Sequence, residues 1–98
     1  MPDFPGGTDA LMNFLSENIK YPIPAFREGI QGTVSLRFII NTDGELSDIQ
    51  VLRGIGGGCD EEAIRVVKLM PKWKPGLQNG KPVRVYYVLP IKFFKFRK

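Results

Sequence analysis

The first hydrophobic pattern along the chain predicts a helix that begins near Thr8. We expect the Thr8 hydroxyl to cap this helix, because a serine or threonine oxygen can accept from the free N–H groups of the first turn. The helix should end before Tyr21-Pro22, since the residue that precedes a proline is pushed out of the helical region. Residues 1–7 are expected to be the end of a linker. The apolar residues of the helix keep the i, i+3, i+4, i+8 spacing of one buried face: Leu11, Phe14, Leu15 and Ile19.

From Thr33 the hydrophobic period changes to two, which predicts a half-buried strand to Ile40. Asp43-Gly44 is a turn sequence, and a second strand is expected from Leu46 to about Leu52. Two strands joined by such a turn should form an antiparallel hairpin. The apolar face of the first strand carries Val34, Leu36, Phe38 and Ile40.

A second amphipathic helix follows a glycine-rich segment, residues 54–58, which we expect to be a flexible loop. Asp60 is predicted to cap this helix, and Pro71 to end it. After a turn near Asn79-Gly80, residues 83–96 form the longest β-rich run in the chain. The helix buries Ala63, Ile64, Val67 and Met70, and one face of the last strand carries Val83, Val85, Tyr87, Leu89, Ile91 and Phe93.

These elements predict an α+β fold, with two helices packed on a three-stranded antiparallel sheet. The predicted strand order is 2-1-3, with a long C-terminal strand at one edge. Ninety-eight residues, of which 43% are hydrophobic, are typical of a single globular domain. We therefore expect one domain that spans residues 8–98.

The composition argues against several kinds of catalytic and metal site. The chain has no histidine and one cysteine, whereas structural zinc takes four such ligands and Cys-His or Ser-His nucleophiles need a histidine. The glycine loop lacks the dinucleotide and P-loop patterns, and three acids follow it where a phosphate would bind. Cys59 is expected to be a small, partly buried filler. We predict no catalytic residue, no metal and no cofactor.

The charges are divided unevenly along the sequence. All ten acids lie in residues 1–62, whereas residues 63–98 hold ten bases and no acid. Bases and aromatics alternate in residues 92–98, as in binders of single-stranded nucleic acid. The Phe93 face is, however, needed for the core, and the aromatic signature of RNA-recognition modules is absent. We therefore expect no nucleic-acid partner, although this class stays open as an alternative.

Pro90 indicates how the last strand is used. Proline cannot donate to a strand ladder, so within sheets it is found mainly at edges and bulges. A long, aromatic edge aggregates unless basic residues guard it or a partner strand completes it. The guards would be Arg84, Lys92, Lys95 and Arg97. The alternative is a site for β-strand addition, in which backbone hydrogen bonds supply the affinity.

A set of short motifs in fixed order resembles the C-terminal domain of TonB-type energy transducers. The resemblance covers residue 18 to the end, and the preceding helix resembles the extension in Bacteroidetes-like versions. It implies a periplasmic domain of a protein anchored in the inner membrane and driven by ExbB and ExbD through its N-terminal part. The motifs are Tyr21-Pro22, Ala25, Ile30 and Gly32, Val34, Leu36 and Phe38, Asp43-Gly44, Ala63, and Trp73-Lys74-Pro75-Gly76.

The resemblance also implies a binding site. Family members bind the TonB box, a short peptide of outer-membrane receptors for nutrient uptake, as a strand beside the last main strand. The segment before Tyr-Pro lies near the receptor in the family. Carried to this sequence, the partner-binding residues are Lys20, Tyr21, Pro22, Val83, Arg84, Val85, Tyr86, Tyr87, Val88, Leu89, Pro90, Ile91, Lys92 and Phe93.

Two further possibilities share this fold. One is an accessory domain of an envelope sensor or peptidase that does not energise transport. The other concerns assembly, because an exposed edge strand also allows two copies of the chain to pair as a homodimer.

Overall fold

A central strand, β1 (Gly32–Ile40), organises the structure, which is a computed structural model that describes residues 2–94. β1 pairs antiparallel with β2 (Leu46–Arg53) on one side and with β5 (Val85–Phe93) on the other, giving the order β2-β1-β5. The remaining elements are α1 (Gly7–Asn18), α2 (Ile23–Glu28), α3 (Cys59–Lys68), β3 (Gly76–Gln78) and β4 (Lys81–Val83). The predicted α+β class and sheet order are confirmed.

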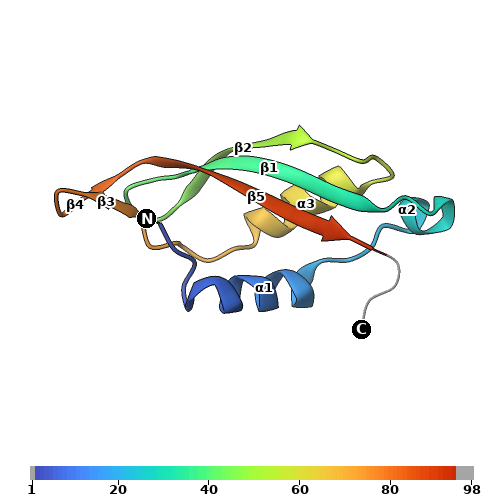
Figure 1. Cartoon of the computed structure of the whole chain (residues 1–98), viewed down its shortest axis with the longest axis horizontal. Helices are drawn as coiled ribbons and strands as arrows, with labels where there is room; N and C mark the ends of the chain where they lie inside the picture. The colour runs from blue at the N-terminus through green and yellow to red at the C-terminus, as the bar shows by residue number, and fades with distance from the viewer. Residues whose placement is uncertain (1, 95–98) are drawn as a thin grey trace.

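The helices α1 and α3 lie on the same side of the three-stranded sheet, as Figure 1 shows. The apolar faces predicted for both helices and for the first strand meet in one core, to which Val66 also contributes. The face predicted for the last strand joins this core from Tyr87 to Phe93, but Val83 and Val85 lie outside it. No helix of residues 2–94 lies over the opposite face of the sheet (Figure 1). Buried core residues are Phe4, Leu11, Leu15, Ala25, Val34, Leu36, Phe38, Ile40, Cys59, Ala63, Val66, Val67, Trp73, Leu89, Ile91 and Phe93.

Both predicted helix caps are wrong. α1 is preceded by Gly6 and α3 by Gly58, each with a positive φ, and neither helix has a side-chain cap. Because a left-handed glycine turns the chain directly into the helix, Thr8 lies inside the first turn. Asp60 instead accepts hydrogen bonds from the N–H groups of Ile55 at 2.9 Å and Gly56 at 3.4 Å.

The glycine loop is therefore held in place from two sides. Asp60 ties its first residues to α3, and Gly57 packs against α2. A Cβ atom at Gly57 would lie 2.8 Å from both Ala25 Cβ and Ile30 Cδ1, which is closer than such atoms approach. This close packing, together with a φ of 66°, explains a glycine there and differs from the flexible loop that was expected.

The start of the chain also differs from the expected linker. Phe4 is 5% exposed, and its ring centroid lies 5.6 Å from those of both Phe14 and Trp73. Asp3 and Lys74 exchange two backbone hydrogen bonds of 3.0 and 2.7 Å. Residues 2–7 thus pack as part of the domain, and the composition of Pro5-Gly6-Gly7 reflects a tight turn into α1.

The long last strand is divided in the structure. β4 pairs with β3 as a separate hairpin around Asn79-Gly80, and β5 begins at Val85. The division falls there because Val85 pairs with Ile40, the last residue of β1, so that earlier residues have no partner on β1. β5 ends at Phe93, and residues 95 and 96 lie outside the described part of the chain.

Candidate functional site

The candidate site is the open edge of β5. Within the described sheet, β5 is bonded to β1 on one side and to no strand on the other. The pairing with β1 runs without a register shift from Gly32↔Phe93 to Ile40↔Val85. The edge strand predicted from Pro90 is therefore present, and it is continuous over nine residues, or about 30 Å.

The direction of the backbone groups along this edge follows from a hydrogen bond at the end of β1. The Asn41 N–H donates to the Glu45 carbonyl, and thus points toward β2. Backbone groups of successive residues in a strand point to opposite neighbours, so odd residues of β1 face β2 and even residues face β5. Ser35, which lies opposite Pro90, faces β2. The pair Ser35↔Pro90 is then not hydrogen-bonded, and Pro90 faces the open edge.

The same alternation assigns the other backbone groups of β5. Tyr86, Val88 and Lys92 face the open edge with both N–H and C=O, whereas Pro90 offers a carbonyl alone. Tyr87, Leu89 and Ile91 use their backbone groups on β1. Proline at position 90 therefore costs the sheet no hydrogen bond, and the edge keeps three donors.

The side chains of β5 divide between the two faces of the sheet. Leu89, Ile91 and Phe93 are buried in the core, whereas Tyr86 and Val88 are 64% and 54% exposed on the uncovered face. The Arg37 guanidinium lies 4.9 Å from the centre of the Tyr86 ring, a cation–π contact. Phe93 is 2% exposed and is not available for stacking on a nucleic-acid base.

The second predicted segment, residues 20–22, lies at the C-terminal end of β5. The Tyr21 ring centroid lies 5.9 Å from that of Phe93 in an edge-to-face arrangement, and the Tyr21 hydroxyl donates to the Ile30 carbonyl. Val83 and Arg84 lie at the other end of the strand, where Arg84 Nε donates to Asn41 Oδ1 at 3.2 Å. The predicted residues therefore do not form a single cluster; they are spread along the length of β5, from Val83 and Arg84 at one end to residues 20–22 at the other.

Helix α3 anchors the segment that precedes Tyr21. Glu62 Oε2 accepts from the Lys20 N–H at 2.7 Å, and Arg65 Nη2 donates to the Asn18 carbonyl at 2.9 Å. Arg65 also forms an ion pair of 2.7 Å with Glu62. The hydrogen bond from Arg65 is the main cause that lowers the pKa of Glu62, with the bond to Lys20 adding to it. The Glu62 carboxylate and Arg65 therefore hold the segment after α1 against α3.

Replacing Glu62 with glutamine should lower the free energy of unfolding by about 1 kcal/mol at neutral pH, since charge-assisted hydrogen bonds are lost. Because the folded-state pKa is lowered, the contribution of the carboxylate is present above the ordinary glutamate pKa of about 4.3. It disappears as the pH falls through the lowered pKa of the folded state. Urea unfolding of both proteins should thus converge in acid; a difference that persists at pH 2 would contradict this assignment.

Cys59 is a core residue as expected, but it is completely rather than partly buried. Burial raises the pKa of its thiol, and the carboxylates of Asp60, Glu61 and Glu62 raise it further. A neutral, inaccessible thiol has no nucleophilic role. Residues 2–94 contain no group of three acidic or cysteine side chains arranged to bind a metal ion. No helix in the same range has the length and apolar content needed to cross a bilayer.

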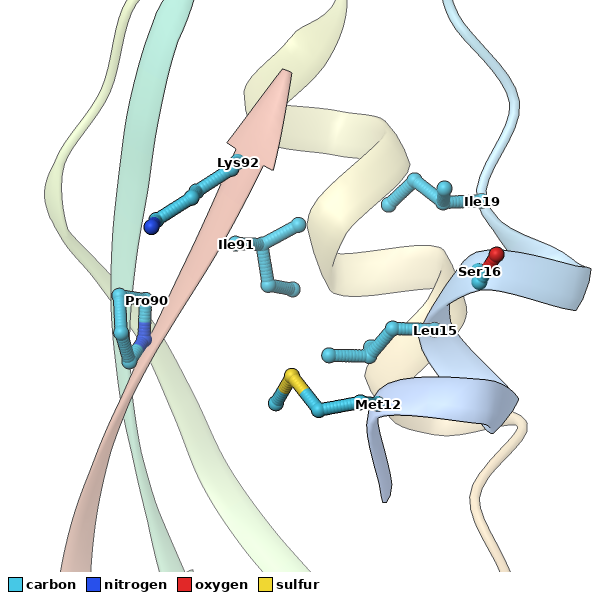
Figure 2. A pocket seen from close by; sticks show the side chains of 7 residues that line it. All are labelled: Met12, Leu15, Ser16, Ile19, Pro90, Ile91 and Lys92. Carbon is cyan, nitrogen blue, oxygen red and sulfur yellow. The ribbon is translucent and has the colours of Figure 1, made fainter. Parts of the chain in front are cut away.

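A groove that sequence reasoning missed lies between α1 and β5. It measures about 350 Å³ and opens beside the edge strand. Figure 2 shows Met12 and Leu15 of α1, and Ile19 just after it, pointing toward β5, with Ile91 pointing back toward them. The helical spacing of Leu15 and Ile19 had marked both as core, but no pattern in the sequence indicated that α1 would lie beside β5. The groove is lined by Met12, Leu15, Ser16, Ile19, Pro90, Ile91 and Lys92.

Comparisons with known proteins identify relatives of this fold. Residues 17–94 match the family described as Gram-negative bacterial TonB protein C-terminal. Protein TonB of Pseudomonas aeruginosa is 35% identical over 80 residues, which cover 80% of this chain and 22% of that protein. The chain thus spans about a fifth of the length of this curated relative.

Solved structures agree with the sequence match. The solution structure of a TonB C-terminal domain from Helicobacter pylori has a TM-score of 0.67 and 27% identity, covering 96% of this chain and 89% of that one. The solution structure of the Pseudomonas aeruginosa TonB C-terminal domain has a TM-score of 0.61 and 29% identity, covering 82% of each chain.

Proposed function

Because this chain belongs to the family of Gram-negative bacterial TonB C-terminal domains, we propose that it is the receptor-binding domain of a TonB-like energy transducer. Its partner is the TonB box, an extended peptide segment of outer-membrane receptors. The box pairs with β5 as an added strand. The domain is not an enzyme in this proposal and uses no cofactor.

The open edge of β5 is the observation that carries the proposal. An added strand needs a long, continuous run of free backbone groups, and β5 offers donors at Tyr86, Val88 and Lys92 and a further acceptor at Pro90. Main-chain pairing suits a link that forms and releases repeatedly, because it requires little side-chain chemistry. Residues 20–22 lie at the C-terminal end of β5, where the Tyr21 ring contacts that of Phe93.

The remaining parts of the proposal concern the protein to which this domain belongs. The domain would lie in the periplasm, joined to an anchor in the inner membrane. ExbB and ExbD would act on the N-terminal part of that protein and supply the energy of the proton-motive force. The domain would transmit this energy to the receptor and so allow nutrient uptake.

Titration of the ¹⁵N-labelled domain with receptor box peptides tests the proposal. We expect the amide signals that shift most to lie in Val83–Phe93. The exposed edge of β2 and the loop 54–58 serve as internal controls, because neither is part of the proposed site. Shifts that cluster in the loop, or a complete lack of shifts in β5, would overturn strand addition at this edge.

A further inference from the structure

The groove between α1 and β5 lies beside the open edge, on the helix-covered side of the position that an added strand would occupy. α1 and β5 run in the same direction (Figure 1), and the groove lines the open side of β5. The α1 residues that line the groove follow the i, i+3, i+4 spacing of one helix face, and the residue that follows the helix, Ile19, extends this wall: Met12, Leu15, Ser16 and Ile19. The face of α1 formed by Met12, Leu15 and Ser16 therefore borders the space beside the edge.

This face of α1 is only partly covered in the structure. Leu15 is 8% exposed and contacts the core, whereas Met12, one turn earlier, is 49% exposed. Ile91 forms the opposite wall and is 3% exposed. The groove beside β5 thus has apolar walls, and no side chain from the three strands of the sheet fills the space between them. Side chains of a fourth strand alternate between the two faces, and every second one would point into this groove.

On the uncovered face of the sheet, the residue next to Ile91 in β5 is charged rather than apolar. Lys92 points away from α1 in Figure 2, toward the uncovered face. No acidic residue occurs in β1 or β5, and no carboxylate of residues 2–94 forms an ion pair with the Lys92 ammonium. An added strand would therefore place one side chain in an apolar groove and its neighbour beside this ammonium.

We propose that the groove takes an apolar side chain of the receptor segment that pairs with β5, while the adjacent side chain of that segment is a carboxylate held by Lys92. This inference rests on the proposed function and adds to it which peptide sequences the β5 edge would prefer. The favoured partner is an extended peptide in which an aliphatic residue is followed or preceded by aspartate or glutamate. A second copy of this chain fits less well, because its own β5 brings one base, Lys92, and no acid to the edge.

A double-mutant cycle tests the groove. Met12→Gln keeps the length of the side chain but makes it polar, and a box peptide is compared with versions in which each aliphatic residue in turn becomes alanine. For one position, Met12→Gln should weaken the parent peptide by about tenfold and the alanine peptide by less than about twofold. Asn13→Gln is the matched control, since Asn13 is exposed on α1 outside the groove. It should change neither affinity.

A second cycle tests the charge. Lys92→Met removes the ammonium but keeps the stem, and it should abolish the preference for a peptide with glutamate over the same peptide with glutamine.

If Met12→Gln binds all peptides like the unmodified domain while β5 amides still shift, the groove is not a specificity pocket and strand addition stands. An unchanged glutamate preference in Lys92→Met likewise overturns the charge contact. If no peptide shifts β5 amides, the proposed function itself fails. Concentration-dependent self-association that the peptides do not reverse would assign the edge to a second copy.

Discussion

Replacing Trp73 with alanine is expected to lower the free energy of unfolding by about 3–5 kcal/mol, because the change removes a large side chain from the middle of the core. The Trp73 side chain is 3% exposed. Its ring centroid lies 5.6 Å from that of Phe4, 5.7 Å from Phe38 and 5.0 Å from Tyr87. It therefore joins the N-terminal segment to β1 and β5, and its removal leaves a cavity that three separate elements would have to fill.

Urea unfolding followed by circular dichroism measures this loss. Leu77→Ala is the control, because Leu77 is 61% exposed on the β3–β4 hairpin and its truncation should cost about 0.5 kcal/mol or less. A loss below about 1 kcal/mol for Trp73→Ala would mean that the aromatic cluster is not the centre of the core. Near-ultraviolet circular dichroism of the native proteins should show the same contrast.

Replacing Val88 with proline should weaken box peptides by roughly thirtyfold or more. The change removes an N–H that faces the open edge and leaves a carbonyl of the partner strand without its donor, at a cost of about 1–3 kcal/mol. The ladder to β1 is spared, because Val88 lies opposite Arg37 in a pair that shares no hydrogen bond. Pro90, two residues later, shows that the strand accepts proline in this orientation.

Val88→Ala is the matched control, since it shortens the same exposed side chain but retains the N–H. It should bind within a few-fold of the unmodified domain. Peptides methylated on alternate backbone nitrogens give an independent readout that needs no protein variant. Methylation on nitrogens that face β5 should abolish binding, and methylation on the alternate ones should not. Equal affinity of folded Val88→Pro and Val88→Ala would contradict the assigned direction of the edge.

Much of the fold follows from hydrophobic period and turn chemistry. The alternation from Val34 to Ile40 and the Asp43-Gly44 turn specify the β1–β2 hairpin, because both act over a few neighbouring residues. Pro90 indicated an edge strand, and the sheet order confirms it. The stripes of α1 and α3 were likewise visible, since a helix buries residues at fixed spacing.

Other features depend on contacts between distant parts of the chain. The composition of residues 1–7, which is rich in proline and glycine, indicated a linker. Phe4 within this segment is nevertheless buried, with its ring against that of Trp73. The division of the last strand at Arg84 depends on where β1 ends, some 40 residues earlier. The groove residues Met12 and Ile91 come from opposite ends of the sequence, and only the docking of α1 beside β5 brings them together.

Hydrogen exchange during the peptide titration tests strand addition at the β5 edge most directly. Amide groups that face the open edge should gain protection when the box peptide binds, namely those of Tyr86, Val88 and Lys92. The amides of Tyr87, Leu89 and Ile91 already bond to β1 and should change little. This alternation distinguishes strand pairing from side-chain contact on either face of the sheet. Uniform protection along β5, or protection at the edge of β2 instead, would contradict the proposed mode of binding.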